Sequence, residues 1–284
     1  MPEAPEVSNV LAYLEENLKG AQIESVKVTH PKLAANESVE DFERKLAGEH
    51  FRKFIRHGKY LIFEMDDLDF VAHLRMEGKF LLYNSLEELE AADPIKDKKH
   101  IHAIFSLSDG RILAYKDTRK FGRMYLYPKT EDVCSLPVFD KVGKDALDPG
   151  LTAKELYEKT RKRKLPIKSI LLDQKVIAGI GNIYADEILF DAGLAPQTPA
   201  SHLDLADWQK ILQAARSILA DAASQGGTTI RSFSYGTNHG GSYQNQLKVH
   251  AREDGLCGKC QGELVRLKIG GRSTWYCPAC QKEK

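Results

Sequence analysis

The first strongly periodic segment lies close to the beginning of the chain. Between residues 5 and 18, apolar side chains recur every three or four positions, at Val7, Val10, Leu11, Leu14 and Leu18. This spacing places them on one face of a helix. Gly20 follows, and glycine readily adopts the left-handed backbone that ends a helix. The pattern therefore predicts an amphipathic helix over residues 5–18.

From Ile23 to about Tyr127 the pattern changes to short runs rich in β-branched and aromatic residues. These runs are IESVKV, FRKFIRHGKYLIFEM, FVAHLRMEGKFLLY and HIHAIFSLSDGRILAYKD. The pair Asp109-Gly110 stands between two apolar runs, which is a strong signal for a β-hairpin. We therefore expect residues 1–130 to form an antiparallel β-sandwich domain that includes the first helix.

The second half of the chain is mostly helical in pattern. Residues 131–150 are irregular and suit a linker between domains. Helical periodicity follows at about 153–163, 166–175, 183–192 and 205–223, which predicts a helical domain over 151–225. Residues 226–246 are rich in Gly, Ser, Thr and Asn and indicate a long functional loop. The fold class is therefore α+β with two domains, and residues 247–284 form a cysteine-bearing module.

Composition limits the function classes without choosing one. The chain has 284 residues, of which 42% are apolar and 29% charged, and its length suits about two domains. No run approaches the roughly 18 apolar residues of a membrane span, and no signal peptide is present, so we expect a cytoplasmic protein. The formal net charge is +1, but basic residues cluster in 161–168, in 117–123 and near the C-terminus. One such run is usually a solvated surface, and three together weaken that interpretation.

Four of the five cysteines have the spacing of a metal site. Cys257, Cys260, Cys277 and Cys280 form the pattern C-x2-C-x16-C-x2-C, which predicts one structural Zn²⁺ rather than disulfides. Four thiolates leave no open coordination position, so this metal should fold a hairpin and not catalyse. A Gly-Gly turn between the pairs presents Arg272, either as a phosphate clamp or as a solvated turn. The fifth, Cys134, is expected to be a small buried filler.

The segment GIGNIYADEIL (179–189) is a glycine-flanked loop that leads into a helix. Asn182 is the expected N-cap of that helix. Backbone N–H groups at a helix start favour an anion, although most such starts are only capped helices. The basic run 161–168 precedes this segment and a short connection to another helix follows it. The arrangement is similar to a helix-turn-helix variant that grips a DNA backbone.

The opening stretch MPEAPEV carries a candidate nucleophile. Removal of Met1 would leave Pro2 with a secondary amine, and an α-amino group has an ordinary pKa of about 7.7–8.0. Such an amine can attack a sugar or carbonyl carbon to give an iminium, while Glu3 and Glu6 move protons. The alternative is a frayed terminus with a proline in the first turn of a helix.

Seven segments spread over nearly the whole chain carry a joint resemblance. They are MPEAPEV, HGKYLIFE, HLRMEGKF, DTRKFG, IKSILLDQKVIAGIGNIYADEILF, QGGTTIRSF and GGRSTWYCPACQ. Together, and in this order, they resemble one family, the bacterial formamidopyrimidine-DNA glycosylases, which are bifunctional enzymes that excise oxidised purines. The resemblance implies a helix-two-turn-helix domain over 151–225, a loop over 226–246 that caps the lesion, and a zinc finger over 247–284.

The resemblance also implies the reaction and its partner. The expected substrate is double-stranded DNA with 8-oxoguanine, a formamidopyrimidine or an abasic site. The enzyme would act as a nucleoid-associated monomer with one Zn²⁺ and no redox or nucleotide cofactor. Pro2 would form a Schiff base at C1′ of the damaged nucleotide, followed by β and δ elimination. Glu3 would donate a proton to the sugar oxygen, Glu6 would support the terminus, and Lys59 would contact phosphate and act as a proton donor.

The remaining expected contacts with DNA come from both halves of the chain. Met76, Arg119 and Phe121 match the residues that fill the space left by a displaced base, and Arg119 would pair with the orphaned cytosine. From their strand setting alone, Met76 and Phe121 would be assigned to the core. Asn182 and Arg272 match a phosphate clamp. The further expected contacts are His100, His102, Lys120, Lys168 and Tyr243.

Some positions depart from the family pattern, and rival functions stay open. The departures are Ala4, Ser8, Asn9, Lys120, Ser169, Ser273 and Trp275, none of which removes a reacting group. One rival is the sister branch that prefers oxidised pyrimidines, which the trio of Met76, Arg119 and Phe121 disfavours. Another is a catalytically silent protein that binds damaged DNA. A zinc-ribbon adaptor would not account for the first half of the chain.

Overall fold

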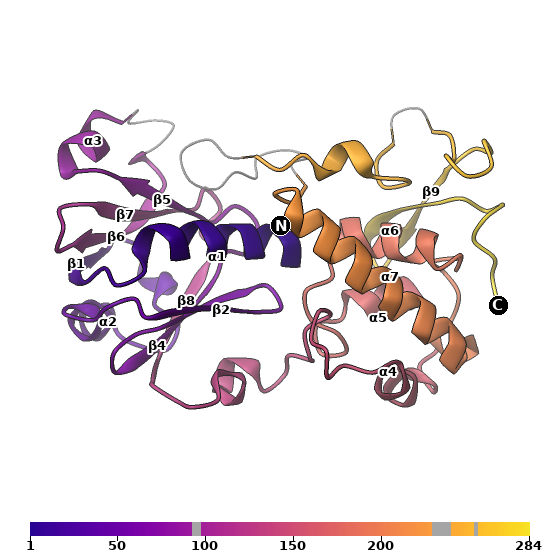
Figure 1. Ribbon diagram of the computed structural model, residues 1–284, viewed down its shortest axis with the longest axis horizontal. Helices are drawn as coiled ribbons and strands as arrows, with labels where there is room; N and C mark the ends of the chain where they lie inside the picture. Colours follow the sequence, from indigo (N-terminus) through magenta and orange to yellow (C-terminus); the bar gives the residue numbers. More distant parts are fainter. Residues whose placement is uncertain (93–97, 229–239, 253–254) are drawn as a thin grey trace. The chain divides into compact units, whose positions relative to one another are not determined.

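The computed structural model describes residues 1–92, 98–228, 240–252 and 255–284 (Figure 1). The chain divides into two compact units. Unit 1 contains Met1–Pro137 and Gly226–Gly241, and unit 2 contains Val138–Gln225 and Ser242–Lys284. Among the described residues, no helix combines the length and the apolar character that crossing a membrane would need.

Unit 1 is built on two four-stranded antiparallel sheets, which confirms the predicted β-sandwich. The first sheet has the order β1 (Ile23–Val28), β6 (Ile101–Leu107), β7 (Ile112–Lys116), β5 (Lys79–Tyr83). The second has the order β2 (Lys53–His57), β3 (Tyr60–Glu64), β4 (Leu68–His73), β8 (Arg123–Pro128). Among the residues of unit 1 that the structure describes, three α-helices accompany these sheets, α1 (Ala4–Leu18), α2 (Val39–Leu46) and α3 (Leu86–Ala91).

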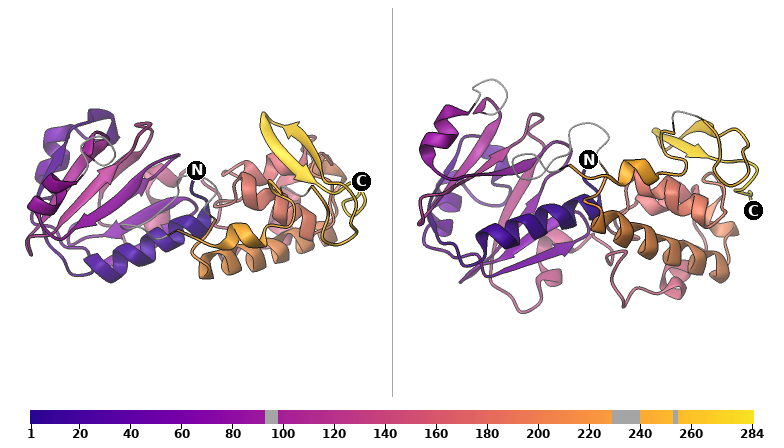
Figure 2. Two further views of the ribbon diagram at one scale, coloured as in Figure 1. Left: turned by 90° about the horizontal axis from the view of Figure 1, so that it is seen from above. Right: turned by 45° about the horizontal axis from the view of Figure 1, so that its top comes forward.

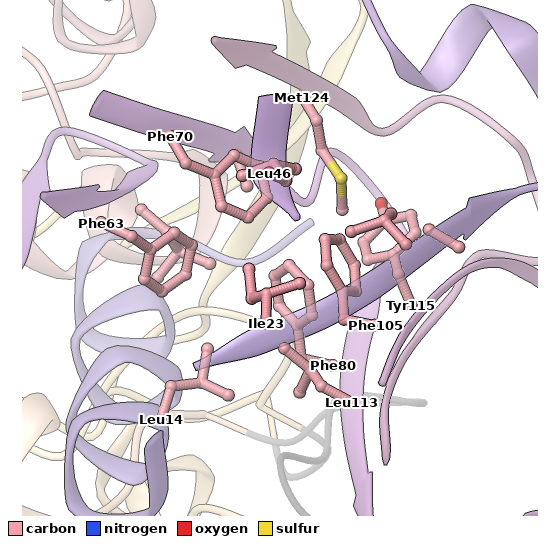
Figure 3. Packing of buried hydrophobic residues seen from close by; sticks show 14 of the residues in the cluster. Leu14, Ile23, Leu46, Phe63, Phe70, Phe80, Phe105, Leu113, Tyr115 and Met124 are labelled. Atoms are coloured by element: carbon pink, nitrogen blue, oxygen red, sulfur yellow. The ribbon is translucent and has the colours of Figure 1, made fainter. Parts of the chain in front are cut away.

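The core of unit 1 joins the two sheets to the apolar face of α1. Leu14 of α1 packs in the same cluster as Phe63 and Phe70 of the second sheet and Phe105 of the first (Figure 3). The predicted helix is confirmed, and Gly20 after it has a φ of +82°. Burying aromatic side chains of this size supplies much of a domain's hydrophobic stabilisation.

Two tight turns connect neighbouring strands of unit 1. The predicted hairpin at Asp109-Gly110 joins β6 to β7, and Gly110 has a φ of +88°. A second turn, at Gly58 and Lys59, joins β2 to β3, with a φ of +58° at Gly58. Glycine adopts this left-handed backbone without the steric penalty of a side chain.

Unit 2 contains the four predicted helices and a terminal hairpin. The helices are α4 (Ala153–Thr160), α5 (Ile167–Leu172), α6 (Asn182–Asp191) and α7 (Leu205–Ser224). The hairpin consists of β9 (Val265–Ile269) and β10 (Arg272–Tyr276). Trp208 of α7 is fully buried in the core that these helices share. Strand β10 packs against α6, and Figure 2 shows the yellow hairpin beside that helix.

Candidate functional site

The first turn of α1 holds a buried carboxylate next to the chain terminus. Glu6 is 2% exposed, and its Oε2 accepts the backbone N–H of Glu3 at 2.8 Å. Its Oε1 accepts the N–H of Thr228 at 2.7 Å. Pro2 and Glu3 are buried beside it, whereas Met1 is 49% exposed. A carboxylate that accepts two N–H groups is fixed in place, so Glu6 is suited to holding the terminus.

Gly227 allows the chain at Thr228 to come close to Glu6 in the first turn of α1. A Cβ at Gly227 would lie 2.8 Å from Oε1 of Glu6, and the φ of Gly227 is +81°. No other residue fits both requirements without strain. Residues 229–239, which make up most of the predicted capping loop, lie outside the described residues.

Lys59 lies in the turn between β2 and β3 and is only 3% exposed. A neutral histidine is close to it: burial, with the charges of Arg75 and Lys59, lowers the pKa of His73 to about 3. Nδ1 of His73 accepts the N–H of Arg75 at 2.9 Å, and Arg75 has a φ of +55°. This bond fixes the turn that presents Met76. His73 is a further residue of this site that the sequence pattern did not single out, although it opens the segment HLRMEGKF.

Arg119 and Phe121 lie on an exposed segment after β7. Oδ1 of the buried Asp117 accepts the N–H of Arg119 at 3.0 Å, and Oδ2 accepts that of Gly122 at 2.8 Å. The guanidinium of Arg119 lies 4.8 Å from the centroid of the Phe121 ring. Phe121 is 48% exposed, so the assignment to the core that its strand setting favours is wrong. A buried carboxylate therefore organises an exposed cation and an exposed aromatic ring.

Three further polar residues of unit 1 are expected to contact DNA, and they differ in their exposure. Lys120 is exposed, with a φ of +57°. His102 is 6% exposed and its Nε2 lies 2.9 Å from the carbonyl oxygen of Asp117, whereas His100 is only half-buried. Burial lowers the pKa of His102. Of the two histidines, His100 is the more accessible to a ligand.

In unit 2, the side chain of Asn182 is hydrogen-bonded to strand β10 of the terminal hairpin. The helix α6 begins at Asn182 and Gly181 is its N-cap, so the prediction that Asn182 caps the helix is wrong by one residue. The side chain is used elsewhere: Nδ2 donates to the carbonyl oxygen of Ser273 at 3.1 Å. Arg272, the neighbour of Ser273, is exposed after a turn in which Gly270 and Gly271 both have positive φ.

Lys168 lies in the interior of unit 2 and not on its surface. It is completely buried, and its Nζ forms an ion pair with Oδ1 of Asp186 at 2.7 Å. The same ammonium donates to the carbonyl oxygen of Ser273 at 3.0 Å and to Oγ1 of Thr274 at 2.9 Å. Because these groups take up its charge and its N–H bonds, Lys168 anchors the hairpin, and its expected contact with DNA stays a prediction.

Tyr243 is likewise a core residue. It is 6% exposed and packs against Tyr184, with ring centroids 6.0 Å apart. Burial raises the pKa of Tyr243 to about 12. Tyr243 thus contributes to the helical core, and its expected contact with DNA stays a prediction.

Two further acidic residues of α6 organise unit 2 and were missed from sequence. Oδ2 of Asp186 lies 2.7 Å from Nδ1 of His250 and accepts the N–H of Trp275 at 3.2 Å. Glu187 accepts the N–H groups of residues 248, 249 and 250 at 2.8–2.9 Å. Burial raises the pKa of Glu187, and these N–H groups oppose that shift. The signal was an acidic pair inside an otherwise apolar helix.

The four clustered cysteines have the geometry of a zinc site. Their Sγ atoms all lie within 4.8 Å of one another, with Cys257 and Cys280 at 3.8 Å and Cys260 and Cys277 at 3.5 Å. Zn–S bonds of about 2.3 Å in a tetrahedron require sulfur atoms about 3.8 Å apart. The residues therefore fit the predicted structural metal ion.

Cys134 does not join that cluster, and the prediction that it is a buried filler is wrong. The thiol is exposed, with Sγ 3.8 Å from Nδ1 of His57. The short turn Val133–Ser135 buries Val133 and leaves the next side chain on the surface. With three residues per turn, successive side chains of a 3₁₀ turn point about 120° apart, so one can face the interior while the next faces solvent.

Comparisons with known proteins agree with this arrangement. Residues 1–124 match the formamidopyrimidine-DNA glycosylase N-terminal domain, 142–234 the H2TH domain of the same enzymes, and 257–282 a zinc finger found in FPG and IleRS. The formamidopyrimidine-DNA glycosylase of Exiguobacterium sibiricum is 41% identical over 283 residues, and that of Bacillus cereus strain ZK / E33L is 39% identical over 282. Each match covers 99% of both chains.

The solved structures give the same result. The Fpg protein of Lactococcus lactis, in a complex with DNA containing an abasic site, matches with a TM-score of 0.87 and 34% identity. A MutM structure with carbocyclic 8-oxo-G containing DNA matches with a TM-score of 0.86 and 35% identity. Each match covers 99% of this chain and all of the other chain. With homology over its full length, three matching domains and a fitting zinc site, this chain belongs to the formamidopyrimidine-DNA glycosylase family.

Proposed function

We propose that this protein is a bifunctional DNA glycosylase and AP lyase that removes oxidised purines from duplex DNA in base excision repair. The observation that carries the proposal is the buried cluster of Pro2, Glu3 and Glu6 at the start of α1. Family members have been solved with DNA containing Fapy-dG, an abasic site or carbocyclic 8-oxo-G. A protein that only bound damaged DNA would have no need of an amine and two carboxyls held together.

The chemistry begins at the N-terminus after removal of Met1. The neutral nitrogen of Pro2 attacks C1′ and forms a C–N bond, while the bond from C1′ to the damaged base breaks and the leaving base takes up the proton that the Pro2 nitrogen loses. Glu3 protonates the ring oxygen of the sugar, so that the ring opens to an iminium. Loss of a C2′ proton then expels the 3′ phosphate, and a second elimination expels the 5′ phosphate.

The surrounding residues hold the reacting groups in place. Glu6 fixes the backbone of Glu3 through the 2.8 Å hydrogen bond, so the first turn of α1 cannot rotate away from the sugar. Lys59, in its tight turn, supplies a cation for the phosphate beside the lesion and a further proton donor. Such fixed charges are more effective in a site from which water is excluded.

The DNA contacts come from exposed and half-buried residues of both units. Met76 and Phe121 fill the space that the displaced base leaves, and Arg119 pairs with the opposite cytosine. Asn182 and Arg272 hold phosphates. His100 and Lys120 add backbone contacts. When zinc is bound, four thiolates close the hairpin and keep Arg272 in position.

The test is cleavage of end-labelled duplexes by the full-length, zinc-loaded protein. We expect release of 8-oxoguanine opposite cytosine and a one-nucleotide gap with phosphate at both ends. Glu3→Gln should bind the same duplex but excise the base at least 100-fold more slowly, in the range for loss of a general acid. Preference for an oxidised pyrimidine would instead favour the sister branch, and binding without cleavage of any lesion would favour a silent damage-binding protein.

A further inference from the structure

Tyr115 is a buried tyrosine of β7 that the mechanism above does not use. It is 1% exposed, and its ring lies 5.2 Å from the ring of Phe80, its partner on β5. Figure 3 shows Tyr115 among the labelled side chains of the buried cluster. The hydroxyl is the one polar atom of this side chain, and buried hydroxyls are normally kept because they serve a contact.

Two glycines crowd that hydroxyl from different segments. A Cβ at Gly78 would lie 2.3 Å from the Tyr115 oxygen, and a Cβ at Gly122 would lie 1.8 Å from it. Neither glycine has a left-handed φ, so neither is required by its backbone conformation. At Gly122 the close approach to the tyrosine ring excludes a side chain. At Gly78 the tyrosine oxygen and the backbone carbonyl oxygen of Leu74, 2.6 Å from such a Cβ, both exclude one.

These glycines follow the residues proposed to fill the vacated space in DNA. Gly78 lies two residues after Met76, and Gly122 follows Phe121 directly. The same hydroxyl lies 3.5 Å from Oδ2 of Asp117, which accepts the N–H of Gly122 at 2.8 Å. One phenol oxygen therefore touches the base of both segments and the carboxylate that organises the second one. Burial raises the pKa of Tyr115, so the oxygen stays protonated and can donate.

We propose that Tyr115 is a positioning residue whose hydroxyl sets the spacing between the Met76 segment and the Arg119–Phe121 segment, and thereby determines the selectivity for the base opposite the lesion. The inference rests on the proposed function, in which Arg119 reads that base. Recognition by a planar guanidinium depends on alignment, and a bidentate contact changes discrimination by about fivefold to a hundredfold. Slack between the two segments should weaken this contact before it affects the chemistry at Pro2.

The test compares Tyr115→Phe with Tyr83→Phe. Tyr83 is a matched control because it is also a buried tyrosine of this sheet. It lies at the end of β5 opposite to Phe80, the partner of Tyr115, and packs with Leu89 and Ile112. Single-turnover rates are measured for full-length, zinc-loaded protein on 8-oxoguanine opposite cytosine, on 8-oxoguanine opposite adenine, and on a preformed abasic site. For Tyr115→Phe we expect the cytosine-to-adenine ratio to fall at least about fivefold, with the abasic-site rate within about twofold of wild type. For Tyr83→Phe we expect an unchanged ratio.

A second variant approaches the same contact from the other side. Gly122→Ala places a Cβ against the tyrosine oxygen and should also lower the ratio. In Tyr115→Phe/Gly122→Ala the two effects should be less than multiplicative, because one contact is being changed twice.

Three outcomes would overturn the inference. An unchanged ratio in folded Tyr115→Phe excludes the positioning role and leaves the proposed function intact. An equal loss on all three substrates shows that the hydroxyl serves only stability. A wild-type protein that cleaves no oxidised base removes the proposed function and this inference together.

Discussion

The substitution Asp186→Asn should destabilise unit 2 strongly. It keeps the size of the side chain but removes its charge, so the ammonium of Lys168 is left fully buried without a counter-ion 2.7 Å away. Asp186 also lies against Nδ1 of His250 and accepts the N–H of Trp275, and these contacts are weakened in the same step. The perturbation therefore affects the junction of α5, α6 and the terminal hairpin.

The expected loss of stability follows from the burial of both Asp186 and Lys168. Removing one member of a buried ion pair destabilises a protein by about 3–5 kcal/mol, because the remaining charge loses its partner and cannot reach water. Both side chains here have 0% exposure, so we expect the full range for Asp186→Asn. Lys168→Met should cost less, since Asp186 keeps His250 and the Trp275 N–H. The double variant should cost less than the sum by about 1–3 kcal/mol.

Tryptophan fluorescence during guanidinium unfolding measures this effect selectively. The chain has two tryptophans, Trp208 and Trp275, and both belong to unit 2. Arg163→Met is the matched control, because its ion pair with Asp173 is 3.0 Å long but the side chains are 37% and 33% exposed. We expect that control to lose less than about 1 kcal/mol. A loss below about 1 kcal/mol for Asp186→Asn, or strict additivity with Lys168→Met, would refute the assignment of a buried pair.

Three further predictions follow from single residues. The pKa of His73 is lowered to about 3 from about 6.5, so the unfolded chain binds the proton first as the pH falls, and the free energy of unfolding should fall by about 1.4 kcal/mol per pH unit below pH 6.5. Thermal melts of wild type and His73→Asn at pH 5.0–7.5 check this. Equal slopes of stability against pH for the two proteins would contradict it. Cys260→Ser should lose zinc and DNA affinity, and normal affinity in a metal-free preparation would contradict the role of the hairpin. Glu6→Gln turns an NH₂ group toward the N–H of either Glu3 or Thr228, so that one hydrogen bond to the side chain is lost. Borohydride trapping should then fall about tenfold with unchanged DNA binding. Unchanged trapping would show that Glu6 does not hold the nucleophile.

The sequence predicted the features that depend on local pattern. The helix before Gly20, the hairpin at Asp109-Gly110 and the four helices of unit 2 all follow from spacing over a few residues. The zinc site follows from the spacing of its cysteines, because two CxxC pairs have few other uses in one chain. These signals are short in range and strong.

The features that the sequence did not predict depend on distant partners. Lys168 belongs to a basic run and looks exposed, but its partners include Thr274, 106 residues away in the chain. The role of Glu6 involves Thr228, 222 residues away. Tyr115 would be counted as ordinary core, because only the positions of Gly78 and Gly122 in space show what its hydroxyl contacts. No periodicity encodes such pairings, which arise when tertiary packing is complete.

The most direct test of the central claim is borohydride trapping on a duplex with 8-oxoguanine opposite cytosine, followed by mass mapping of the adduct. The account predicts a covalent adduct on an N-terminal peptide that begins at Pro2 and lacks Met1. An intact, zinc-loaded protein without Met1 that binds the duplex but gives no adduct and no strand cleavage would contradict it. So would an adduct that maps to an internal lysine, because Pro2 would then not be the nucleophile.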